Sequence, residues 1–116
     1  MTPPTKVLYL GQTAGDPFRP GWQRRLLHTD RLMTVVLDID NGPWSAPDPF
    51  HSHPHEQITY VAEGEVLFLS EGEQPKRLRA GDLVAIASGR PHAIQLLSPR
   101  ARLVDNFNPI REDFLK

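Results

Sequence analysis

Four of the five histidines in this chain lie in two segments whose spacing can build a site for one metal ion. His51, His53 and His55 alternate along a short segment that ends at Gln57, and His92 lies far downstream. On an extended backbone, side chains two residues apart point to the same face, so His51, His53 and Gln57 share one side. If a later strand brings His92 beside them, three imidazole nitrogens and one amide oxygen surround a common point. This donor set suits one divalent transition metal ion, and Zn, Ni, Fe(II), Mn and Co all remain open.

Other residues of the same segment indicate a role in the site less clearly. His55 shares the parity of the ligands in a regular strand, but Pro54 can twist it away, so its contact with metal or substrate is left open. Glu56 is interpreted as a solvated charge at the rim. Gln57 is a neutral amide that leaves the full charge of the metal in place, which strengthens its Lewis acidity toward an anionic or hydroxylated substrate.

A second group of candidate residues lies near the end of the chain. Leu103, Asp105 and Phe107 alternate, so they share one face of a strand. A carboxylate between two large apolar side chains needs a partner or a chemical role. The partner would be Arg102 or Arg111. The alternative is a role as a general acid and base whose pKa is tuned by the pocket and the metal.

Further side chains are candidates for contact with a substrate. Arg111 can present a bidentate guanidinium to a carboxylate, and the alternative is an exposed charge of the tail. Phe107 supplies either a flat wall for a sugar ring or part of the core. Strand parity places Thr59 on the ligand side and Tyr60 on the other side. Trp44, which precedes the histidines, is expected at the mouth of the pocket.

Short strands must position these residues. Twelve prolines and eight glycines lie between short apolar runs, which disfavours long helices and favours strands joined by turns. The start of the chain through residue 20 is interpreted as irregular, with an edge strand at 7–10 and a turn at 16–21. The tail at 111–116 is predicted to hold one helical turn. Strands are predicted at 31–39, 57–63, 66–70, 76–79, 83–86 (buried), 92–97 and 101–107. This pattern is typical of an all-β sandwich or barrel.

Composition narrows the class of protein. A chain of 116 residues forms one domain with a modest core, and a net charge of −1 gives no basic field for nucleic acid. The absence of cysteine excludes disulfides, thiolate metal sites and a cysteine nucleophile. The start of the chain lacks a signal peptide and no stretch can span a bilayer, so we expect a cytoplasmic protein. The remaining charges are interpreted as solvated, including those at 24–25, 71–79 and 100–102.

The two histidine segments resemble the motifs of the cupin superfamily. The first motif has two histidines one residue apart, then a glutamine or acidic residue and a glycine, here His51, His53, Gln57 and Gly64. The second is present as Gly81, Asp82, Gly89 and His92. The match covers residues 50 to about 97. Two positions depart from the common pattern: Ala87 replaces a proline, and Gln57 replaces the commoner glutamate.

The resemblance implies a single small cupin barrel, a double-stranded β-helix of the jelly-roll type, over residues 1–116. We predict a barrel core at about 31–107, an N-terminal arm at 1–22 and a C-terminal tail at 108–116. The resemblance also assigns the ligands of the metal, which are His51, His53, Gln57 and His92.

The end of the chain is similar to the pectin-degradation cupins of KdgF type. In that family a strand carrying Asp and Phe runs into a Pro-x-Arg-Glu-Asp-Phe segment, here Asp105, Phe107 and residues 109–114. The run at 53–57 is also similar to theirs. The resemblance implies that Asp105 and Arg111 are catalytic and that Phe107 and Arg111 bind the substrate, and strand parity makes Thr59 a further substrate-binding residue.

The implied reaction opens the ring of 4,5-unsaturated monouronates from pectin or alginate and ketonises them to linear keto acids. Such an isomerase or tautomerase needs no organic cofactor. Arg111 would orient the carboxylate of this small anionic sugar acid, and Asp105 would relay a proton. The source of the preferred uronate is left open. Alternatives are another metal-dependent cupin enzyme, such as a dioxygenase or sugar isomerase, or a non-catalytic sugar-acid-binding cupin. Because cupin barrels commonly pair, we expect a homodimer, with residues 5–10 as a candidate for edge pairing.

Overall fold

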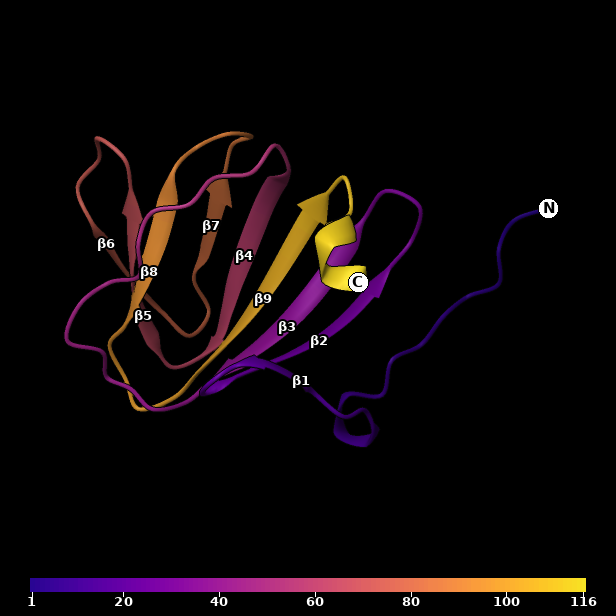
Figure 1. The fold of residues 1–116 in the computed structure, drawn as a ribbon, viewed down its shortest axis with the longest axis horizontal. Coiled ribbons are helices and arrows are strands. Elements are labelled where there is room, and N and C mark those ends of the chain that lie inside the picture. Colours follow the sequence, from indigo (N-terminus) through magenta and orange to yellow (C-terminus); the bar gives the residue numbers. More distant parts are fainter.

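The computed structural model describes residues 1–116 as two antiparallel β-sheets that face each other (Figure 1). The larger sheet has six strands in the order β1-β2-β3-β9-β4-β7, and the smaller has three in the order β6-β5-β8. The strands are β1 (Asp16–Arg19), β2 (Trp22–His28), β3 (Met33–Ile39), β4 (Glu56–Glu63), β5 (Glu65–Ser70), β6 (Lys76–Arg79), β7 (Leu83–Ile86), β8 (His92–Leu96) and β9 (Ala101–Asn108). Single 3-10 turns lie near the two ends, η1 (Leu10–Gln12) and η2 (Glu112–Leu115). The all-β prediction is confirmed.

The neighbouring strands β4 and β9 carry the clearest alternation of buried and exposed residues. Their register pairs Gln57 with Phe107 and Thr59 with Asp105. All four side chains are buried. The pleat therefore points a row of polar groups and one aromatic ring to the inside of the barrel.

The apolar core is divided into two clusters. The larger one consists of Trp22, Ile39, Val61, Val66, Leu96, Ala101 and Leu103, and the smaller one of Met33, Val35 and Phe107. On β9, Asp105 lies between Leu103 of the first cluster and Phe107 of the second. The buried polar groups thus occupy the gap between two apolar regions, which hold them in place on both sides.

The strands predicted from residue 31 onward are confirmed, with ends that shift by one or two residues. The burial predicted for β7 is correct only at Ile86: Leu83 is 63% exposed and Ala85 is exposed too, because alternate side chains of this strand point outward. The helical turn of the tail is present as η2.

The predictions for the start of the chain are wrong in three places. Residues 7–9 form no strand, and β1 occupies part of the segment interpreted as a turn. β2 was missed because an arginine, Arg24, takes an inward position between Trp22 and Leu26 and hides the alternation. The residues before η1 extend away from the sheets (Figure 1). No helix in the structure has both the length and the apolar character needed to cross a bilayer.

Candidate metal centre and the adjoining pocket

The structure brings His51, His53 and His92 together at one end of the barrel. His51 and His92 form an isolated antiparallel bridge, in which each backbone N–H donates to the other carbonyl at 3.0 and 2.9 Å. One ring nitrogen from each of the three residues lies within 4.8 Å of the others. The backbone bridge thus brings His92 beside His51, as the metal site predicted from the sequence requires.

His53 and Gln57 face each other in a way that calls for a cation between them. Nδ1 of His53 donates to the carbonyl of His55 at 3.0 Å, which leaves a lone pair on Nε2 of the neutral ring. Oε1 of Gln57 lies 3.0 Å from this Nε2, while the amide nitrogen of Gln57 donates to Thr59 at 2.9 Å. Burial, followed by the charge of Arg111, lowers the pKa of His53 and favours the neutral ring. Two acceptors that face each other so closely are satisfied by a shared positive ion.

His92 presents a similar unfilled lone pair. Its Nδ1 donates to the carbonyl of Arg90 at 2.7 Å, and its Nε2 is buried without any hydrogen-bond partner. A backbone carbonyl that fixes the tautomer is the usual support of a metal-binding imidazole. Burial is also the main reason why the pKa of His92 is lowered.

The third histidine is neutral as well. Burial, and then the neighbouring His92 and His53, lower the pKa of His51 to about 4. Three neutral imidazoles beside an amide oxygen match the ligand preferences of divalent transition metals, so the residues present fit such an ion. The ring of His55 lies outside the group of three, edge-on to His53 with centroids 5.5 Å apart, and its Nδ1 is buried without a partner.

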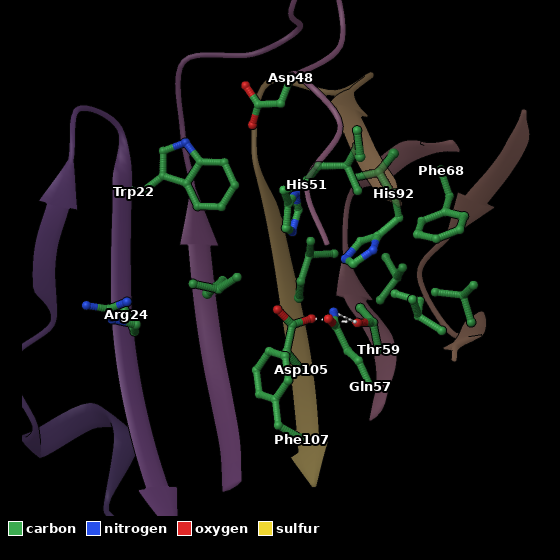
Figure 2. Close-up of a pocket in the computed structure, with 18 of the residues that line it drawn as sticks. Trp22, Arg24, Asp48, His51, Gln57, Thr59, Phe68, His92, Asp105 and Phe107 are labelled. Atoms are coloured by element: carbon green, nitrogen blue, oxygen red, sulfur yellow. Dashed lines mark hydrogen bonds between the residues drawn. The ribbon is translucent and has the colours of Figure 1, made fainter. Parts of the chain in front are cut away.

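A chain of hydrogen bonds joins this centre to Asp105. The hydroxyl of Thr59 accepts from the amide of Gln57 and donates to Oδ1 of Asp105 at 2.6 Å (Figure 2). Burial raises the pKa of Asp105 to about 6, although the hydrogen bond from Thr59 acts in the opposite direction. A carboxyl with this pKa exchanges its proton readily near neutral pH.

The salt bridges considered for Asp105 do not form. Arg102 pairs instead with Asp38 at 2.7 Å, and Arg111 pairs with Asp113 at 3.0 Å. Asp105 therefore has no salt-bridge partner, and its carboxyl is held by the hydroxyl of Thr59 and the adjacent amide of Gln57. A buried carboxyl of raised pKa is a candidate for proton transfer.

Arg111 is not an exposed tail charge. Its guanidinium lies 5.1 Å from the ring centroid of Phe107 and 4.3 Å from that of Phe114, and its side chain is only 15% exposed. Nε and Nη2 both donate to the carboxylate of Asp113, at 3.1 and 3.0 Å. One edge of the guanidinium is therefore already in use, and Nη1 is the nitrogen without a protein partner.

The candidate residues surround a cavity of about 420 Å³ between the two sheets. Its lining includes seven of the residues selected from the sequence: His51, Gln57, Thr59, His92, Asp105, Phe107 and Arg111. Figure 2 shows Asp105 next to Gln57 and Thr59, with His51 and His92 nearby. His53 is part of the histidine group but does not line the cavity. The cavity has the size of an ordinary small-molecule site.

Several residues of the cavity were missed by the sequence analysis. Arg19 and Arg24 line it, and so do Trp22 and Asp48. The interpretation of Arg24 as solvated is wrong. Trp22 and Leu26, each two residues away along β2, point to the same face as Arg24, and their apolar character indicates that this face is the inner one. Trp44, expected at the mouth, does not line the cavity and packs on Trp22 with ring centroids 5.8 Å apart.

The family of the chain follows from comparison with known proteins. Residues 35–104 match the family described as the cupin domain, so the chain belongs to the cupin family. The predicted jelly-roll barrel of cupin type is thereby confirmed.

Within that family, the chain is similar to the KdgF proteins, as the sequence motifs predicted. Pectin degradation protein KdgF of Dickeya dadantii is 32% identical over 106 residues, which are 90% of this chain and 93% of the relative. The structure of KdgF from Halomonas sp. has a TM-score of 0.84 and 32% identity, and the match covers 94% of this chain and 99% of that one.

A second similarity is to dimethylsulfoniopropionate lyase DddQ of Ruegeria pomeroyi. The identity is 53% over 65 residues, which are 56% of this chain and 31% of the lyase. The crystal structure of that lyase has a TM-score of 0.70 and 30% identity, and the match covers 92% of this chain and 56% of that one. This chain therefore spans only part of the length of the lyase.

Proposed function

We propose that this chain is a metal-dependent enzyme that opens the ring of 4,5-unsaturated monouronates and converts them to linear keto acids. The observation that carries the proposal is the hydrogen-bonded connection from Gln57 through Thr59 to the buried Asp105, beside the three-histidine group. The similarity to KdgF over nearly the whole chain supports a substrate from pectin or alginate breakdown.

A divalent ion held by His51, His53, Gln57 and His92 would supply positive charge that stabilises negative charge on substrate oxygens. The side chains on β9 and the tail hold the rest of the substrate. Phe107 offers part of its ring as an apolar wall, and Arg111 donates from Nη1 to the carboxylate. Thr59 keeps the carboxyl of Asp105 in place.

Asp105 would move the proton that the reaction transfers. Opening the ring removes a proton from the hydroxyl at C1, breaks the bond between C1 and the ring oxygen, and leaves an enolate over C4, C5 and the former ring oxygen. Protonation at C4 then gives the ketone. Because Asp105 can accept the first proton and donate the second, the carboxylate is regenerated and no redox change occurs. A positioned acid and base of this kind contributes roughly 10²- to 10⁴-fold to the rate.

The similarity to DddQ favours a second candidate function, lysis of dimethylsulfoniopropionate. That substrate carries a sulfonium cation, which needs aromatic faces or carboxylates around it. In this cavity most aromatic rings already carry a guanidinium group: Arg19 lies 4.5 Å from the centroid of Trp22, Arg24 lies 4.4 Å from that of Phe114, and Arg111 covers Phe107. Phe68 is the exception. The three arginines of the lining can bind the carboxylate that both substrates carry, but they disfavour the sulfonium cation, so the uronate is preferred.

The test is loss of the ultraviolet absorbance of the conjugated enol when metal-loaded protein is added to unsaturated uronates from pectin and from alginate. We expect acceleration above the spontaneous rate that disappears in His92→Ala and falls by roughly 10²-fold or more in Asp105→Asn. Unchanged absorbance with folded, metal-loaded protein would contradict the proposal. Release of dimethyl sulfide would then support the lyase, oxygen uptake a dioxygenase, and uronate binding without turnover a binding protein.

We also propose that the enzyme is a cytoplasmic homodimer of single-domain chains, each with the barrel, arm and tail divisions given above. The arm keeps Val7 and Tyr9 largely exposed, and the outer face of the large sheet exposes Ile58 and Leu83. Exposed apolar groups on a small domain favour association with a second surface. Light scattering is expected to give twice the mass of 13.1 kDa, and a monomer at micromolar concentration would contradict this part of the proposal.

A further inference from the structure

Arg24, like Arg19 and Asp48, is a charged residue of the cavity for which the mechanism above gives no role. It lies on β2 (Figure 2), and its side chain is only 13% exposed. The same cavity is lined by Arg24, Asp105 and Arg111. Its neighbour Arg25 points to the opposite face of the strand and pairs with Asp38. The inward position of Arg24 therefore places a permanent positive charge in the proposed substrate site.

The surroundings of Arg24 fix its guanidinium without using all of its donors. The group lies 4.3 Å from the ring centroid of Phe18 and 4.4 Å from that of Phe114. Nη2 donates to Asp16 at 3.0 Å, whereas Nε and Nη1 have no protein acceptor and are not fully buried. A stacked guanidinium loses little further freedom when it binds an anion, so it is well prepared to do so.

Arg24 and Arg111 share one aromatic neighbour. Both guanidiniums lie within 4.4 Å of the centroid of the Phe114 ring, although the two residues are far apart in the sequence. Each guanidinium already pairs with one carboxylate, Arg24 with Asp16 and Arg111 with Asp113, and each keeps N–H donors without a protein partner that an anion can use. Because Asp113 already occupies Nε and Nη2 of Arg111, a substrate carboxylate needs donors from elsewhere to be fully bound.

We propose that Arg24 is a second carboxylate-binding residue, which holds the acid group of the substrate together with Arg111. The proposal rests on the proposed uronate substrate. Arg24 belongs to the larger sheet and His92 to the smaller one, so an acid held by the two arginines extends from β2 toward the histidine group. The reacting part of the sugar then lies beside Asp105. Arg24 accordingly determines affinity and selectivity for acids more than the rate of proton transfer.

The competing role for Arg24 is a structural one, in which it only fastens the tail through Phe114. A purely structural role predicts that its loss weakens every ligand and lowers the melting temperature. A carboxylate-binding role predicts that the loss is confined to acids. Galacturonate and galactose make this distinction, because they differ at C6 and neither contains the reacting double bond.

The experiment measures the binding of galacturonate and galactose to metal-loaded wild type, Arg24→Gln, Arg24→Lys and the matched control Arg25→Gln. We expect Arg24→Gln to lose galacturonate affinity by roughly 10- to 100-fold, the usual effect of removing hydrogen bonds to a charged group, with galactose binding unchanged. Arg24→Lys should recover part of this affinity, since it keeps the charge and loses the planar fork. Arg25→Gln should match the wild type.

The outcomes separate this proposal from the proposed function. A loss confined to galacturonate supports Arg24 even if unsaturated uronates are not turned over, in which case only the reaction is refuted. Equal affinity of Arg24→Gln and wild type for galacturonate overturns the proposal, and so does an equal loss for both sugars. A wild type that binds no galacturonate also overturns it. With active enzyme, KM for the unsaturated uronate should rise roughly 10-fold or more while kcat changes little.

Discussion

The hydroxyl of Thr59 donates a 2.6 Å hydrogen bond to Oδ1 of Asp105, its register partner across β4 and β9. The hydroxyl has a single proton, so its oxygen must serve as the acceptor for the amide of Gln57 at 2.9 Å. This sets the orientation of the amide and turns Oε1 toward His53. One threonine thus connects the proposed proton relay to the proposed metal ligand.

Replacing Thr59 by valine should alter the dependence of the reaction on pH. The hydrogen bond from Thr59 stabilises the charged form of Asp105, so its removal raises the pKa of Asp105 above its value of about 6. Because the charged form accepts the first proton, the acidic limb of the pH–rate profile should move to higher pH. The variant Thr59→Ser keeps the hydroxyl and should keep the wild-type profile. An unshifted limb in Thr59→Val would show that this hydrogen bond does not tune the carboxyl.

Asp105 should also make the metal-free protein less stable as the pH rises. Its pKa is raised from 3.8 to about 6, so between these values the folded state holds a proton that the unfolded state has released. The free energy of unfolding therefore falls through this window by at most ~3 kcal/mol, since one pKa unit corresponds to about 1.4 kcal/mol.

The histidines have the opposite effect on stability. Their pKa values are lowered in the folded protein, so their contribution to the free energy of unfolding increases as the pH rises. The difference between wild type and Asp105→Asn isolates the carboxyl from this effect. Urea unfolding of both metal-free proteins at pH 4 and pH 7 should show the variant gaining relative stability at the higher pH. A constant difference would mean that the carboxyl is charged at little cost in the folded protein.

The sequence was informative where local patterns determine the structure. β4 and β9 alternate cleanly, so the inward positions of Thr59, Asp105 and Phe107 follow from parity alone. The spacing of the two histidine motifs predicted that His92 would join His51 and His53. A period of two and a motif of fixed spacing are visible in any single sequence.

The sequence was uninformative where long side chains meet residues distant in the chain. The guanidinium of Arg24 stacks on the ring of Phe114, which lies near the other end of the chain. No residue close to either one in the sequence predicts this contact. The hydrogen bonds from Arg111 to Asp113 likewise form only because the tail bends at η2. These contacts are consequences of tertiary packing, which local propensity does not encode.

Gly64 should be much less tolerant of substitution than Gly72, although both have a left-handed backbone with φ of +82° and +76°. A Cβ atom at Gly64 would meet the carbonyl oxygen of Arg100 and lie 2.8 Å from Cα of Ala101, whereas at Gly72 nothing lies within 4 Å. Gly72→Ala should cost only the ~1–2 kcal/mol of an L-residue in this conformation. Gly64→Ala should cost that amount and at least ~1 kcal/mol more, because the clash is with backbone. Urea unfolding measures both, and equal losses would contradict the prediction.

Arg90 should support metal binding, although its own side chain points away from the histidines. Its carbonyl oxygen accepts the proton on Nδ1 of His92 at 2.7 Å, and so directs Nε2 toward the metal position. The guanidinium of Arg90 anchors this turn by donating to Ser70 at 2.8 Å and to Glu73 at 2.7 Å. Groups that orient a ligand in this way typically contribute roughly 10- to 100-fold to metal affinity.

We therefore expect Arg90→Gln to bind zinc about 10-fold more weakly than the wild type in competition with a chromogenic chelator. Arg77→Gln is the matched control, because Arg77 pairs with Glu65 on the exposed strand β6 and does not contact the histidine segments. The melting temperature of each metal-free variant reports any general loss of folding. If Arg90→Gln retains its fold and binds zinc as tightly as Arg77→Gln, the orientation of His92 is determined by the backbone bridge to His51 and not by the anchoring of the turn.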